Sequence, residues 1–170
     1  MISKLIWLMP RVTAAFISTL LLAMFCSLAA QEKSNRPPVP VDNFKVEIKD
    51  FLDEWNTAIA KGDAAAIRSA YVADARFQWF EDGVLTYRSS GEIVDKLRQF
   101  PKGTKIDTRL SDINIRLLTD KLAYGNASFS TKIALPTGPF EFSGVFTMLL
   151  ERHDGQWKFV SGHTSTVRSR

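Results

Sequence analysis

The chain has 170 residues, of which 22 are Lys or Arg and 18 are Asp or Glu, giving a formal net charge of +4 at pH 7. This excess is weak and no basic stripe interleaved with aromatic residues accompanies it, so we expect no nucleic acid partner. Cys26 is the only cysteine, and His153 and His163 stand at opposite ends of one predicted strand. We therefore predict no disulfide, no metal site and no cofactor.

Residues 1–30 have the pattern of a secretory signal peptide. Lys4 and Arg11 give a positive start, residues 13–28 form an apolar run, and small residues close it. We expect an exported protein, periplasmic or secreted, whose mature form keeps 20 basic against 18 acidic residues, a net charge of +2. Two alternatives stay open: a lipoprotein acylated at Cys26, and an uncleaved anchor that would be the only membrane contact.

A linker is predicted over residues 31–42, where three closely spaced prolines exclude helix and favour an extended chain. One domain is expected to follow over residues 43–168. Apolar residues recur from Phe44 to Ile59 at the spacing of one helix face. Gly62-Asp63 ends that helix and caps a second, shorter one over residues 64–71.

A short hairpin and a third helix come next. Alternation over residues 75–79 predicts a strand, Asp82-Gly83 a turn, and residues 84–88 a returning strand. Ser89 and Glu92 have the spacing of a capping box, and Pro101 stops the helix that they begin.

The rest of the domain is predicted to be four long strands. Alternation indicates strands over residues 104–118, 122–135, 140–151 and 157–165, joined by three turns. Strands joined by short turns in this way form an antiparallel meander. The fold class is therefore α+β, with three N-terminal helices packed on a curved antiparallel sheet. Such short helices cannot fill the concavity of so long a sheet, so we expect an internal pocket.

The last strand carries the residues of most interest. The Asp154-Gly155 turn precedes it, and continuous alternation places Trp157 and Phe159 on the inward face. The same alternation predicts that Ser161 and His163 follow them on that face.

The order of these motifs resembles the nuclear transport factor 2-like superfamily, in particular its SnoaL-like members, over about residues 44–167. The resemblance implies a ketosteroid isomerase-like fold, cone-shaped, with a pocket between the helices and the concave face of the sheet. The matching residues are Trp55, Ala58, Gly62-Asp63, Tyr71 to Ala75, Asp82-Gly83, Arg88 to Ile93, Asp154 to Lys158 and His163 to Ser165.

The catalytic residues of enzymes in this superfamily are missing at the matching positions. The base and the two oxyanion-binding residues of the isomerases correspond to Trp79, Trp55 and a position near Thr147. Arg109 and Asp112 fall on opposite faces by alternation, so the Asp-Arg-Asp set of the epoxide hydrolases is not expected either.

The candidate site residues follow from the inward faces. His163 is the candidate catalytic residue, as a general base, with a structural histidine or a ligand contact as the alternatives. The expected ligand pocket consists of Trp55, Phe77, Trp79, Tyr87, Phe142, Phe146 and Ser161.

Three functions are compatible with these residues. The first is an exported module that binds a small apolar or aromatic ligand. The second is an isomerase, cyclase or dehydratase that uses His163. The third is a homodimerisation module that pairs through the outer sheet face, where we expect Val145, Leu149 and Val160.

Overall fold

The computed structural model describes residues 41–167, so the predicted signal peptide and nearly all of the predicted linker lie outside the described residues. Three helices and one curved sheet confirm the α+β class. The elements are α2 (Val41–Lys61), α3 (Ala64–Ser69), β1 (Gln78–Glu81), β2 (Val84–Tyr87), α4 (Ser90–Arg98), β3 (Lys105–Leu117), β4 (Leu122–Leu135), β5 (Gly138–His153) and β6 (Gln156–Thr166).

The helical hairpin forms where the sequence predicts it, although α2 begins at Val41, two residues before the predicted domain start. Phe44, Ile48 and Leu52 of α2 are buried against the sheet, as their spacing requires. Asp63 caps α3, because its carboxylate accepts hydrogen bonds from the backbone N–H groups of the first turn at 3.1 Å.

The third helix, α4, begins after Ser89, whose hydroxyl accepts a hydrogen bond from the N–H of Glu92 at 3.3 Å. The Glu92 carboxylate accepts from the N–H of Arg88 at 2.6 Å, one residue before the cap itself. The capping box predicted at this helix start is therefore present, with its reciprocal bond shifted by one residue.

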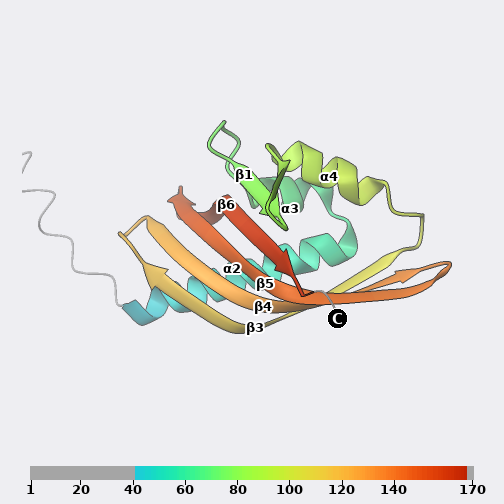
Figure 1. The fold of residues 1–170 in the computed structure, drawn as a ribbon. Helices are drawn as coiled ribbons and strands as arrows, with labels where there is room; N and C mark the ends of the chain where they lie inside the picture. The colour runs from blue at the N-terminus through green and yellow to red at the C-terminus, as the bar shows by residue number, and fades with distance from the viewer. Residues whose placement is uncertain (1–40, 168–170) are drawn as a thin grey trace, which may run out of the picture. The chain divides into compact units, whose positions relative to one another are not determined.

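The six strands have the order β2-β1-β6-β5-β4-β3. The antiparallel meander β3–β6 is confirmed, but β1 lies parallel to β6, so the sheet is mixed rather than wholly antiparallel. The chain passes through β2, α4 and three long strands between β1 and β6, and this long crossover is what permits parallel pairing. In Figure 1 the long strands curve beneath α2, with α4 and the β1–β2 hairpin on the same side of the sheet.

A β-bulge interrupts the alternation of β6. Leu150 pairs with Phe159 and Leu149 pairs with Ser161, so Val160 has no partner of its own on β5. The extra residue reverses the faces of everything that follows it in the strand. Val160 itself is only 7% exposed, so the expectation that it belongs to the outer face is wrong.

A second bulge lies in β3. Ser111 pairs with Ser128 and Asn114 pairs with Asn126, and Asp112 between them has φ of 52°. Simple alternation therefore also fails across this part of β3.

None of the helices within residues 41–167 is long and apolar enough to cross a membrane.

Candidate functional site

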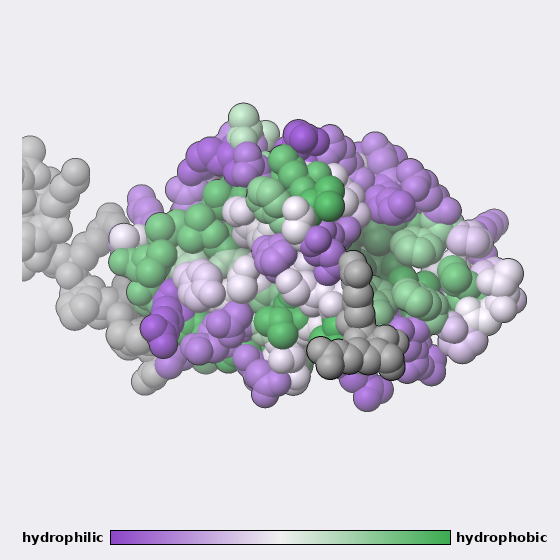
Figure 2. All heavy atoms as spheres, in the orientation of Figure 1, coloured by the Kyte–Doolittle hydropathy of each residue, from purple (hydrophilic) through white to green (hydrophobic). Residues whose placement is uncertain are grey.

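A cavity of about 280 Å³ lies between α2, α4, β1 and the inner face of the sheet. Aromatic and aliphatic side chains form most of its wall. Figure 2 shows hydrophobic side chains gathered around a hollow at the right-hand end of the view, between α4 and the β4–β5 turn. The aromatic lining residues are Trp55, Tyr71, Trp79, Phe129, Phe142 and Phe146, with Tyr87 at one end.

Tyr71 is held in the wall by both its backbone and its ring. The residues after α3 form a parallel bridge to β6, with Phe159 bonded to Ala70 and Val72 at 2.8 and 3.0 Å. The Tyr71 ring packs on Phe77 and Phe159, with centroids 5.0 and 5.3 Å away. Its hydroxyl accepts a hydrogen bond of 2.8 Å from the indole Nε1 of Trp55 on α2.

Trp79 continues the wall beside Tyr71, with the two ring centroids 6.4 Å apart. Its ring lies over Gly162, so closely that a Cβ atom on this glycine would come within 2.3 Å of it. The indole Nε1 donates a hydrogen bond of 3.2 Å to the hydroxyl of Thr164. The pairing of Trp79 with Gly162 and of Glu81 with Thr164 puts all four residues on the cavity face.

A few other polar groups are built into the wall, and they are already paired. Asn56 donates to the carbonyl oxygen of Thr108 at 2.6 Å, and the hydroxyls of Thr108 and Thr131 lie 2.9 Å apart. Because these groups satisfy one another, they line an apolar space without the usual cost of burying unpaired polar atoms.

The rim of the cavity carries three titratable side chains, Glu81, Tyr87 and Lys96. Glu81 stays accessible to solvent, but partial burial and then the charge of Asp82 raise the pKa of its carboxyl. Burial, together with the negative charge of Glu81, raises the pKa of Tyr87 to about 12. The rim therefore offers one acid that binds its proton more tightly than an ordinary glutamate does.

Five of the residues predicted from the sequence line this cavity: Trp55, Trp79, Tyr87, Phe142 and Phe146. Phe77 does not, because it is only 1% exposed and packs behind Tyr71. Phe77 is a core residue that supports the wall.

The predicted inward orientation of His163 and Ser161 is wrong. His163 pairs with Thr147 on one side and with Phe80 on the other, and none of the three lines the cavity. The bulge at Val160 is the cause, since it turns Gly162 and Thr164 inward instead. The structure therefore removes His163 from the set of residues that can reach a ligand in the cavity.

The sequence reasoning missed Tyr71, Glu81, Lys96 and Thr164. A signal existed for Glu81, which stands two residues after Trp79 and so shares its strand face, but its place beside Asp82-Gly83 suggested a turn. Tyr71 falls at the end of the helix predicted over residues 64–71, whereas the structure ends α3 at Ser69 and places Tyr71 in a bridge to β6. Thr164 had no signal, because the bulge that turns it inward leaves no mark in the sequence.

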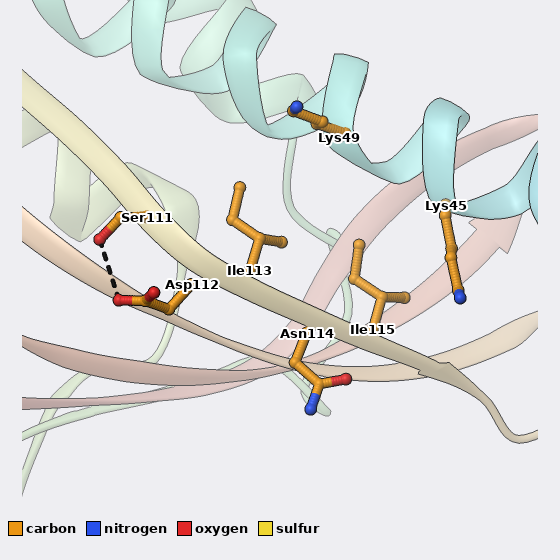
Figure 3. Close-up of a pocket in the computed structure, with 7 residues that line it drawn as sticks. All are labelled: Lys45, Lys49, Ser111, Asp112, Ile113, Asn114 and Ile115. Atoms are coloured by element: carbon orange, nitrogen blue, oxygen red, sulfur yellow. Dashed lines mark hydrogen bonds between the residues drawn. The ribbon is translucent and has the colours of Figure 1, made fainter.

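Two other hollows differ in character from this cavity. One, of about 380 Å³, lies between α2 and the bulge of β3 and is lined by exposed Lys45, Lys49 and Asp112. In Figure 3, Ile113 and Ile115 point from β3 toward α2, whereas Asn114 points away. The other hollow, of about 470 Å³, lies along the opposite side of α2 and includes three acidic residues of that helix.

No group of three potential metal ligands occurs among the residues that the structure describes.

The family model for the SnoaL-like domain matches residues 48–169 of this chain. No curated protein matches it in sequence. The chain belongs to the SnoaL-like family, within the nuclear transport factor 2-like superfamily, as its motifs predict.

Solved structures of three proteins illustrate the shared fold. A candidate calcium/calmodulin-dependent protein kinase II association domain from Xanthomonas campestris is 19% identical, with a TM-score of 0.64 over 81% of this chain and 97% of its own. An NTF2-like protein of unknown function from Shewanella oneidensis is 18% identical, with a TM-score of 0.57 over 71% and 98%. A hexachlorocyclohexane dehydrochlorinase from Novosphingobium barchaimii is 18% identical, with a TM-score of 0.62 over 74% and 88%.

Proposed function

We propose that this member of the SnoaL-like family binds one small apolar or aromatic molecule in the cavity of about 280 Å³. The observation that carries the proposal is the combination of an aromatic wall with a few polar groups that are already paired. Small-molecule sites have this composition, and the volume is near the lower end of their usual range.

The two tryptophans support this proposal because they do not plug the space. Each indole N–H is bonded to the wall, that of Trp55 to Tyr71 and that of Trp79 to Thr164. Turning either ring into the cavity would break its hydrogen bond and leave a buried donor without a partner, which costs about 1–3 kcal/mol. The cavity is therefore kept open by bonds within its own wall.

Ligand binding can be tested with native mass spectrometry and thermal shift against a library of small aromatic compounds. The variant Leu110→Trp fills the cavity from β3, and we expect it to abolish both the mass adduct and the thermal shift. Arg109→Trp makes the same substitution on the neighbouring exposed residue and should bind like the wild type. Binding that survives in Leu110→Trp would place the ligand elsewhere.

A second candidate function is proton-transfer catalysis by Glu81. The observation that favours it is a carboxylate with a raised pKa at the rim of an apolar cavity, which suits a general base. A dehydrochlorinase is among the solved structures with this fold. Compounds that bind can be followed for conversion by mass spectrometry. Glu81→Gln should then keep binding and lose turnover, and turnover at the wild-type rate in this variant would rule the idea out.

Export and self-association complete the proposal. Sequencing the N-terminus of the protein recovered outside the cytoplasm should show cleavage after Ala29 or Ala30.

For a homodimer that pairs through the outer sheet face, Tyr124 and Val145, which are 39% and 46% exposed, would lie at the contact. Sedimentation should detect the dimer, and Val145→Lys should dissociate it. A monomer at high wild-type concentration would contradict this part.

A further inference from the structure

One hydroxyl in the cavity wall has its acceptor side occupied and its donor side free. The oxygen of Tyr71 accepts the Nε1 proton of Trp55 at 2.8 Å. Within residues 43–167, no side chain or carbonyl oxygen accepts the proton of this hydroxyl in return. A phenol hydroxyl donates one hydrogen bond and can also accept. In Tyr71 the oxygen already accepts a hydrogen bond, whereas the O–H donor has no partner.

The surroundings make an uncommitted donor here costly. Tyr71 is only 3% exposed, and its ring is packed between Phe77, Trp79 and Phe159. A buried polar group without a partner loses the free energy of its hydration, so a molecule that enters the cavity gains by supplying an acceptor.

The hydroxyl also stays protonated at any ordinary pH. Burial raises the pKa of Tyr71 well above the usual value for a tyrosine. The hydrogen bond from Trp55 works in the opposite direction, and the negative charge of Glu81 raises the pKa further. Tyr71 is therefore available as a neutral donor and not as a phenolate.

We propose that Tyr71 selects the ligand by donating a hydrogen bond to a neutral acceptor oxygen, such as the carbonyl of a small ring ketone. The inference rests on the ligand binding proposed above and deepens it, because it names the group that distinguishes one apolar ligand from another. An anionic acceptor is disfavoured, since the wall around Tyr71 is apolar and would not compensate a buried charge.

Trp55 acts on the ligand only through Tyr71, as a positioning residue. Its indole occupies one lone-pair direction of the Tyr71 oxygen and so fixes the plane in which the hydroxyl can turn. With one lone pair already accepting from Trp55, the free hydrogen-bonding group that Tyr71 offers a ligand is its O–H donor. This is why the site should discriminate between a ketone and the corresponding alkane, and not bind both equally.

The experiment compares 1-indanone with indane, which share one ring skeleton and differ by the carbonyl oxygen. Dissociation constants of purified protein for both are measured by NMR titration, together with the infrared carbonyl frequency of bound 1-indanone. We expect the wild type to prefer the ketone by roughly tenfold, the worth of one good hydrogen bond. The carbonyl frequency of the bound ketone should lie below its value in a hydrocarbon solvent, where no donor is present.

Variants separate Tyr71 from the remainder of the site. In Tyr71→Phe the preference for the ketone should be lost or reversed, because the carbonyl would be buried without a donor. Indane should bind as before, and the carbonyl frequency should return to its value in a hydrocarbon solvent. Tyr124→Phe removes a hydroxyl from an exposed tyrosine that does not line the cavity, and it should leave the preference unchanged. Trp55→Phe should weaken the preference without abolishing it.

The outcomes distinguish this inference from the binding proposal itself. If neither compound binds, the proposed binding of small aromatic molecules fails. If both bind equally to the wild type, or if Tyr71→Phe keeps the preference, binding stands and the role of Tyr71 is overturned. An unshifted carbonyl in the wild-type complex overturns it as well, whether or not the Tyr71→Phe variant folds.

Discussion

Substituting Gly162 with alanine tests the geometry of the cavity wall most directly. A Cβ atom at this position would meet three atoms of the Trp79 ring at 2.3 to 2.7 Å. Ordinary contacts require more than 3 Å, so the ring must move by roughly 1 Å, and its 3.2 Å bond to Thr164 would break. If β6 alternated without a bulge, Gly162 would face solvent instead and the same change would be harmless.

The expected cost combines three effects. Overpacking a buried site costs about 1–3 kcal/mol, and losing the hydrogen bond adds about 1 kcal/mol. Replacing glycine stabilises by about 0.4–1 kcal/mol, because it restricts the unfolded chain. We therefore expect Gly162→Ala to lower the free energy of unfolding by about 1–3 kcal/mol, which urea titration measures readily. The melting temperature should fall by roughly 4–12 °C.

A double-mutant cycle identifies the contact responsible. Trp79→Phe removes the part of the ring that the new methyl group would strike, so Gly162→Ala should cost less than about 0.5 kcal/mol in that background. His163→Ala is the matched outward control and should change stability by no more than about 0.5 kcal/mol. An equal cost of Gly162→Ala in both backgrounds, or no cost in either, would refute the inward orientation of Gly162.

Three further predictions concern stability, and urea unfolding checks each. Because partial burial raises the pKa of Glu81, the folded protein binds more protons than the unfolded chain between the two pKa values, so stability falls as pH rises through that window. Glu81→Gln should therefore be more stable than the wild type at pH 7 and equal to it below pH 4; a constant difference would contradict this. Glu47 accepts hydrogen bonds of 3.2 Å from both Arg152 and Trp157 of the β5–β6 hairpin, so Glu47→Ala should cost about 1–2 kcal/mol and Glu47→Gln less. Leu52→Ala empties a fully buried position and should cost about 2–5 kcal/mol, against under about 0.5 kcal/mol for Leu118→Ala at a site 57% exposed.

The features that the sequence predicts correctly are those decided by a few neighbouring residues. The Asp82-Gly83 and Asp154-Gly155 turns each place both residues at positive φ, between 48° and 86°. Few residue types tolerate that conformation, so the pair marks the turn by itself. The cap at Asp63 is equally local. These signals, with the spacing of apolar residues, were enough for the order of the elements and the fold class, although the strand predicted from residue 75 begins only at Gln78.

The features that it misses depend on partners distant in the chain. The parallel contact between β1 and β6 joins Trp79 to Gly162, and nothing near either residue indicates it. The bulge at Val160 is decided by the register of β6 against β5, and valine is as common in regular strands as at bulges. Most of the aromatic wall was predictable, because Trp55, Trp79, Phe142 and Phe146 lie on α2, β1 and β5, ahead of any bulge in those elements. Its hydroxyl partners, Tyr71 and Thr164, were not.

The bulge at Val160 also decides how this chain should be aligned with its relatives. Deleting this one codon would restore continuous pairing of β6 with β5 and leave Gly162 and Thr164 facing the cavity. Gain or loss of a residue here is therefore a nearly silent event for the binding site. Against a relative whose last strand lacks the bulge, an alignment without a gap at this point would assign every later residue of the strand to the wrong side, and it would transfer to His163 a role that belongs to its neighbours.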